Sequence, residues 1–78
     1  MEMEKLVEYI VKCLVDEDDA VAITTEREGD TINIIVNVAE EDLGKVIGKN
    51  GRIAQSIRAI VKSVAAKERI RYNVKINK

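Results

Sequence analysis

Hydrophobic residues near the start of the chain recur at the three- and four-residue spacing of one helical face. This spacing predicts an amphipathic helix over residues 3–14, and the acidic run that follows Val15 ends it. The apolar positions of this helix are Met3, Leu6, Val7, Ile10, Val11 and Leu14.

Two runs rich in β-branched residues come next, one over residues 20–28 and one over residues 31–38. The second run alternates, with isoleucine and valine on one face and Asn33 and Asn37 on the other. A short turn around Gly29 separates the two runs, and this arrangement predicts a β-hairpin.

The rest of the chain predicts two helices and a final strand. The short helix over residues 40–47 starts with three acidic residues, which suit the positive end of a helix dipole. A longer helix over residues 52–67 and an alternating strand over residues 69–77 follow. The predicted inward face of the long helix is Ile53, Ile57, Ile60, Val61 and Val64.

The predicted order of elements is α-β-β-α-α-β, which defines an α+β fold. Two helices join the second and third strands, and a connection of that length permits these strands to pair in parallel. We therefore expect one domain over residues 1–78, a three-stranded mixed sheet with helices packed on one face.

Composition excludes several classes of site. The chain has no histidine and a single cysteine, so an internal disulfide, a zinc site built from these ligands and a catalytic triad with histidine are all absent. No apolar run exceeds four residues, which is too short for a membrane-spanning helix or a signal-peptide core. We expect a cytoplasmic protein without a metal or cofactor.

Charge is divided unevenly along the chain. Residues 1–44 carry three basic and thirteen acidic side chains, a net charge of −10, whereas residues 45–78 carry ten basic and one acidic, a net charge of +9. This asymmetry points to a polyanionic or acidic partner for the basic half, or to mutual neutralisation of the halves in the fold.

Two glycines flank two polar residues between the predicted helices, in the segment Gly48-Lys49-Asn50-Gly51. Glycine permits backbone conformations that other residues avoid and leaves room for a nucleic-acid backbone. The turn leads into a helix N-terminus, whose amide groups favour a phosphate, and Lys45 and Arg52 add positive charge nearby.

The context of this G-x-x-G segment resembles the KH domain, whose signature is V-I-G-x-x-G-x-x-I. Here Val46-Ile47-Gly48-Lys49-Asn50-Gly51-Arg52-Ile53 matches it, with the last isoleucine one position early. The element order resembles the type II KH fold, and the resemblance covers nearly the whole chain. It is greatest for the KhpA-like family of small bacterial proteins that consist of one KH domain.

The resemblance implies a single-stranded RNA-binding protein that is not an enzyme and that recognises about four nucleotides. It implies that the loop residues hold the RNA backbone and that further residues line the adjacent groove. The first set is Gly48, Lys49, Asn50 and Gly51, and the second is Lys45, Ile47, Arg52 and Gln55. Family members are described as RNA chaperones or regulators, often paired with a larger KH-containing protein of the Jag family.

These features have three other interpretations. A nucleotide-binding P-loop would need four residues between its glycines and a hydroxyl ligand for magnesium, whereas three residues separate Gly44 from Gly48 and Asn50 takes the hydroxyl position. Base-stacking modules such as the RRM need more aromatic residues than two tyrosines. A KH-like dimerisation or protein-interaction module with weak or no RNA binding remains an alternative.

Pairing with a second KH domain is expected because one such domain contacts few nucleotides. A stripe of small residues beside the predicted buried face of the long helix is the predicted interface. Its members are Ser56, Ala59, Ser63 and Ala66.

Overall fold

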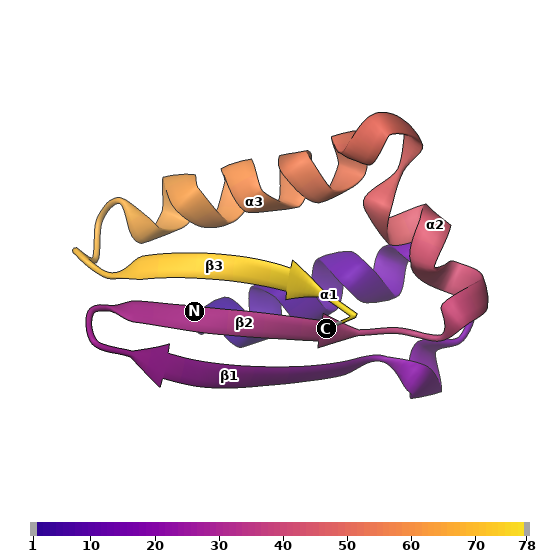
Figure 1. The fold of residues 1–78 in the computed structure, drawn as a ribbon, viewed down its shortest axis with the longest axis horizontal. Helices are drawn as coiled ribbons and strands as arrows, with labels where there is room; N and C mark the ends of the chain where they lie inside the picture. Colours follow the sequence, from indigo (N-terminus) through magenta and orange to yellow (C-terminus); the bar gives the residue numbers. More distant parts are fainter. Residues whose placement is uncertain (1, 78) are drawn as a thin grey trace.

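The secondary structure follows the predicted order of elements (Figure 1). A computed structural model describes residues 2–77, so the predicted domain limits at residues 1 and 78 lie outside the described part of the chain. The helices are α1 (Met3–Leu14), α2 (Leu43–Ile47) and α3 (Arg52–Ala65), and the strands are β1 (Ala22–Glu28), β2 (Thr31–Asn37) and β3 (Arg71–Ile76). Short 3-10 turns occupy Asp18–Ala20, Glu40–Asp42 and Lys49–Gly51.

β2 is the central strand of a three-stranded mixed sheet. It pairs antiparallel with β1, and Gly29 in the connecting turn has a φ of +59°, which suits glycine. β2 also pairs in parallel with β3, with Ile34 opposite Val74. A tight turn cannot join parallel neighbours, so α2 and α3 form the crossover, and Figure 1 places α3 alongside β3. The α+β fold with a mixed sheet is therefore confirmed, and it is consistent with the type II KH fold.

The hydrophobic core lies between the sheet and the helices. Each of the three helices contributes to it, so the loop between α2 and α3 is held by buried side chains on both sides. The best-buried members are Val7, Val11, Ile34, Val36, Val46, Ile57, Val61, Ala65 and Val74.

The predicted inward face of α3 is wrong at two positions. Ile60 and Val64 are 43% and 37% exposed. At 100° per residue, both lie on the side of Ile57 that faces away from Val61, and the buried face extends the other way. Alanines at two buried positions let the helix approach the sheet closely, which leaves the larger side chains at its flank. The buried residues of α3 are Ala54, Ile57, Val61 and Ala65.

The predicted ends of β1, β2, α3 and β3 differ from the observed ones by one or two residues, and α2 starts at Leu43, three residues after the predicted start, because Glu40–Asp42 form a 3-10 turn. α3 ends at Ala65 rather than at residue 67, and the last strand starts at Arg71 rather than at residue 69. Arg69 has a φ of +59°, a left-handed conformation that a strand cannot contain. The turn between α3 and β3 is therefore longer than predicted.

Candidate nucleic-acid interface

Gly48 ends α2 and begins the G-x-x-G loop with a conformation available to glycine alone. Its φ and ψ are 78° and 172°. Its N–H donates to the Gly44 carbonyl at 2.8 Å, and its own carbonyl accepts the Gly51 N–H at 3.1 Å. A Cβ at this position would lie 2.6 Å from Cγ1 of Ile53. Glycine is therefore required here for both its backbone conformation and the space it leaves.

The last two loop positions form a pair of left-handed residues. Asn50 has a φ of 58°, and Gly51 has a φ of 74°. Asparagine tolerates this conformation better than most residues with a side chain. Lys49 and Asn50 are exposed, so both polar side chains of the loop are accessible to a ligand.

α3 starts immediately after this loop, at Arg52. Its N-cap is Gly51, and no side chain among residues 2–77 caps the helix by hydrogen bonding. The amide groups of its first turn and the positive end of its dipole therefore face the loop region, where Lys49 and Arg52 are exposed. This combination suits a phosphate group.

The motif departs from the KH signature at its last position. The isoleucine that the signature expects at position 54 occurs one residue earlier, at position 53. Ile53 is half-buried and packs against Gly48, while Ala54, at the signature position, is 4% exposed. Ala54 therefore occupies the inward-facing position of the helix, and Ile53 packs against Gly48, the first glycine of the loop.

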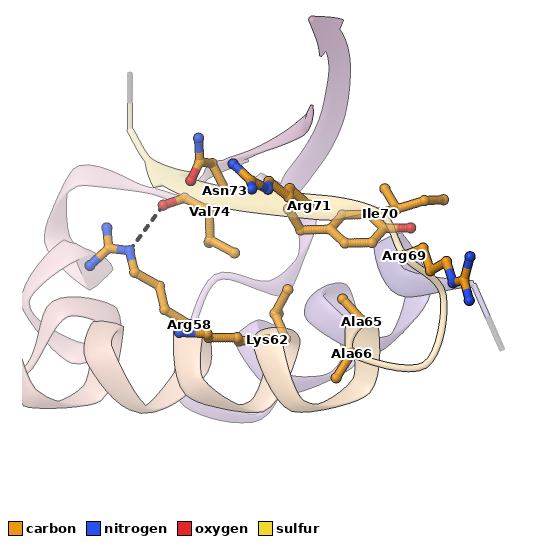
Figure 2. A pocket seen from close by; sticks show the side chains of 11 residues that line it. Arg58, Lys62, Ala65, Ala66, Arg69, Ile70, Arg71, Asn73 and Val74 are labelled. Atoms are coloured by element: carbon orange, nitrogen blue, oxygen red, sulfur yellow. Dashed lines mark hydrogen bonds between the residues drawn. The ribbon is translucent and has the colours of Figure 1, made fainter. Parts of the chain in front are cut away.

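The outer edge of β3 lies next to α3. The N–H groups of Arg71 and Asn77 donate toward β2, to the carbonyls of Asp30 at 3.3 Å and Val36 at 2.6 Å. Successive residues of a strand direct their backbone groups to opposite sides, so the even-numbered residues of β3 direct theirs to the outer edge. The Val74 carbonyl confirms this direction, because it accepts a 3.1 Å hydrogen bond from Nε of Arg58 on α3 (Figure 2).

The predicted RNA-contacting residues fall into two groups in the structure. Gly48, Lys49, Asn50, Gly51 and Arg52 are consecutive and form the loop and the start of α3. The remaining three flank it, with Ile47 half-buried at the end of α2, Gln55 exposed one turn into α3, and Lys45 on α2.

Lys45 is engaged by two carboxylates. Its Nζ bonds to Asp16 and lies 3.3 Å from Oδ1 of Asp42. The hydrogen bond to Asp16 raises the pKa of the Lys45 ammonium. The charge of Lys45 is thus partly neutralised within the protein, and its predicted contact with RNA stays a prediction.

Asp42 is a buried carboxylate that connects α2 to the turn after α1. It is 1% exposed, and its Oδ2 accepts the Glu17 backbone N–H at 2.9 Å. This hydrogen bond, followed by one from the Asp16 backbone and by Lys45, holds the pKa of the Asp42 carboxyl below its usual value against the opposing effect of burial. Asp42 therefore positions the helix from which the G-x-x-G loop departs.

A cavity of about 700 Å³ between α3 and β3 was not predicted from the sequence. Arg58 and Lys62 line it from α3, and Arg69 and Arg71 line it from the turn and β3 (Figure 2). None of these four residues is among those that the sequence predicts to contact RNA. The excess of positive charge after residue 44 was the one signal for this cluster.

Residues 2–77 lack two further features. No helix there combines the length and the apolar character needed to cross a membrane. The same residues contain no group of three or more side chains of the metal-binding types placed to hold an ion.

Comparison with known proteins assigns the family. A family model described as the KhpA/KhpB KH domain matches residues 4–76. Proteins named RNA-binding protein KhpA from Caldanaerobacter subterraneus subsp. tengcongensis and Clostridium acetobutylicum are 51% and 46% identical to this chain over 74 residues, which cover 95% of it and 99% of each relative. A protein of the same name from Halalkalibacterium halodurans is 39% identical over 95% of this chain and 97% of its own. The chain therefore belongs to the KhpA/KhpB KH-domain family.

Proposed function

We propose that this chain binds single-stranded RNA, about four nucleotides at a time, and that it acts by binding rather than by catalysis. The observation that carries the proposal is the loop from Gly48 to Gly51, in which Lys49 and Asn50 are exposed and whose left-handed residues lead directly into α3, a helix without a side-chain cap at its start. The relatives named RNA-binding proteins support it.

The loop would hold the RNA backbone, and the surfaces beside it would hold the bases. Lys49, Asn50 and Arg52 would contact phosphate oxygens together with the amides of α3. Ile47, Gln55 and Lys45 would line the groove. The outer edge of β3 supplies backbone donors and acceptors for base edges, which suits recognition without aromatic stacking.

Residues 1–78 would then form one KH domain that serves as an RNA chaperone or a post-transcriptional regulator in the cytoplasm. A single cysteine suits that reducing compartment. The weaker alternative, a KH-like interaction module without RNA binding, makes the opposite prediction for the loop.

The double substitution Lys49→Asp with Asn50→Asp tests the loop. Two carboxylates would face the phosphate, so binding to a four-nucleotide RNA of randomised sequence should be lost, as measured by NMR titration. The fold should persist, because both positions are exposed and aspartate tolerates the left-handed conformation at position 50.

Lys12→Asp with Cys13→Asp is the matched control, since it makes the same change in charge at exposed positions of α1. It should bind as the wild type does. A folded loop variant that binds with wild-type affinity would refute the proposal and favour the interaction module.

We also propose that the chain pairs with a second copy or with a larger, Jag-like KH protein. The exposed flank of α3 favours this, because Ile60 and Val64 lie beside the small residues Ser56, Ala59 and Ser63. Ala59→Arg would place a charge in that contact and should shift a dimer to a monomer by light scattering. A wild-type monomer at high micromolar concentration would refute self-association.

A further inference from the structure

We infer that Asp16, an exposed carboxylate in the turn after α1, competes with RNA for the ammonium group of Lys45 and so determines which phosphates this lysine can bind. The inference rests on the proposed function, because it concerns how Lys45 takes part in holding the RNA. It gives a role in binding to an acidic residue that lies 29 positions before Lys45 in the chain.

The two carboxylates at Lys45 differ in how firmly they are held. Asp42 is buried, and its Oδ2 accepts the Glu17 N–H at 2.9 Å, so the backbone fixes its position. The Asp16 side chain is 78% exposed, and within residues 2–77 its carboxylate bonds to Lys45 alone. Lys45 therefore has one permanent partner and one that a ligand can reach.

An anion from outside can replace Asp16 at Lys45 but not Asp42. An exposed ion pair contributes little to stability, because water solvates both charges when the pair separates. Loss of Lys45 from Asp42 would instead leave a buried carboxylate without its cation. The four-carbon stem of lysine is flexible, so the ammonium can meet a phosphate without movement of α2. The exchangeable position at Lys45 is therefore the one that Asp16 occupies.

Asp16 stays close to Lys45 because the turn after α1 is tied to the start of α2. The hydrogen bond from the Glu17 amide to Asp42 joins the two segments directly beside Asp16. A carboxylate held in this way acts as an anion with an effective concentration on the order of millimolar, so free phosphates at lower concentrations do not displace it.

An RNA bound at the G-x-x-G loop competes on equal terms with Asp16, because it too is held nearby. Lys45 lies three residues before Gly48, which corresponds to about 4.5 Å along α2 at the usual helical rise. Lys45 is therefore open to a phosphate of loop-bound RNA and closed to free phosphates. This contact adds to the affinity of RNA that the loop already holds and gives little to other anions.

Asp16→Asn tests the competition, because asparagine keeps the size of the side chain and removes its charge. The variant should bind a four-nucleotide RNA of randomised sequence about two- to fivefold more tightly than the wild type, which corresponds to the loss of one exposed ion pair. NMR titration measures both affinities. The fold should persist, since the side chain is exposed.

Asp18→Asn is the matched control, since it removes the same charge two residues away, at an exposed position without a bond to Lys45. Its charge acts on RNA only through solvent, where salt screens it, so the variant should bind within about 1.5-fold of the wild type.

A double-mutant cycle separates competition for Lys45 from general repulsion of RNA. Lys45→Gln removes the charge for which Asp16 competes, and the glutamine amide can still donate to Asp42. In the Lys45→Gln background, Asp16→Asn should therefore change the affinity by less than about 1.5-fold.

The wild type offers a direct readout. The carboxyl ¹³C signal of Asp16 should shift when the four-nucleotide RNA is added, because its ion pair opens. The signal of Asp42 should shift less, because the Glu17 amide holds that carboxylate. Inorganic phosphate at about 0.1 mM should move neither signal, since it lies below the effective concentration of the competing carboxylate.

Four results would overturn the inference. They are an Asp16→Asn variant that binds RNA no more tightly than the wild type, an equal gain for Asp18→Asn, a gain that persists in the Lys45→Gln background, or an Asp16 carboxyl signal that RNA does not move. Failure of the proposed function is distinguishable, because it would appear as unchanged RNA binding by the double variant at Lys49 and Asn50, which retains Asp16 and Lys45.

Discussion

At the residue scale, left-handed backbone conformations stand at both ends of α3. Asn50 and Gly51 precede the helix, and Arg69 follows it, with φ values of 58°, 74° and 59°. These left-handed residues let the chain change direction sharply before and after α3. The loop therefore projects from one end of the helix, and β3 runs back along its side. The position of the loop proposed to meet RNA phosphates is thus set by a few backbone angles.

Gly48→Ala should destabilise the protein by about 1–3 kcal/mol, because position 48 has a positive φ and a Cβ there would meet Ile53 at 2.6 Å. Gly44→Ala is the matched control on the same helix, where a Cβ meets nothing within 4 Å. It should be neutral or stabilising, by up to about 1 kcal/mol, since alanine favours helices. Urea unfolding monitored by circular dichroism measures both, and equal stabilities of the two variants would contradict the loop geometry.

Asp42 should make stability depend on acid pH. Its pKa is lowered in the folded state, so its contribution is complete above the ordinary value of 3.8 and is lost as the pH falls through the folded-state value. Asp42→Asn should lower the melting temperature at pH 7, and the difference from the wild type should shrink below about pH 4. The facing groups are Lys45, Asp16 and the Glu17 amide.

Asp16→Asn is the control for this experiment, because the Asp16 side chain is exposed and meets Asp42 only through Lys45, while the backbone hydrogen bond from Asp16 to Asp42 survives the substitution. It should change the melting temperature much less at every pH. A melting temperature of the Asp42 variant that tracks the wild type from pH 3 to pH 7 would show that the carboxylate is not a structural anchor.

At the element scale, α3 has three distinct faces. One packs on the core through Ile57 and Val61, one is an apolar flank with Ile60, and one is a basic flank with Arg58 and Lys62. A helix proposed to serve a partner surface and a ligand surface in addition to the core must divide its circumference among them. The use of alanine at buried positions leaves the larger side chains to the flanks.

Ile57→Ala and Ile60→Ala form a matched pair that tests this division. Ile57 is 2% exposed, so its truncation should cost about 2–5 kcal/mol, whereas Ile60 is 43% exposed and its truncation should cost less than about 1 kcal/mol. Thermal unfolding of the two variants at a low protein concentration measures both. Similar melting temperatures would mean that the inward face is placed wrongly.

Periodicity predicted the elements well and the packing of one of them less well. The 3.6-residue pattern of α1 predicted Met3 to Leu14 correctly, because its charged residues leave a single apolar stripe. The pattern of α3 was ambiguous, since isoleucine and valine spread over a wide arc and the sequence does not show which part faces the sheet. The G-x-x-G loop was placed by its motif, but the cavity at Arg69 joins residues of α3 and β3 that only the folded chain brings together.

At the scale of the whole molecule, the fold keeps an acidic and a basic half within one small domain. The first 44 residues carry a net charge of −10 and the remainder +9. RNA attracted to the basic half is repelled by the acidic half, which opposes non-specific attachment. Binding should therefore depend on a few phosphate contacts at defined positions of the protein.

The salt dependence of binding should reflect this arrangement. A single-stranded ligand releases about 0.7 counterion per neutralised phosphate, so a four-nucleotide RNA should give a slope of log affinity against log salt no steeper than about −3. Fluorescence anisotropy between 50 and 300 mM salt would measure the slope. Tight binding to duplex DNA with a much steeper slope would instead indicate non-specific binding by a general basic surface.

The parallel pairing of β2 with β3 has a consequence for the folding of the chain during its synthesis on the ribosome. Asn33 and Asn73 touch across this pair although 40 positions separate them in the chain. The hairpin of β1 and β2 can form from local contacts early in synthesis, whereas closure of the sheet must wait until residue 76 has emerged. The side of the molecule between α3 and β3 is therefore assembled last, and the RNA contacts proposed for the outer edge of β3 can form only once translation has passed β3.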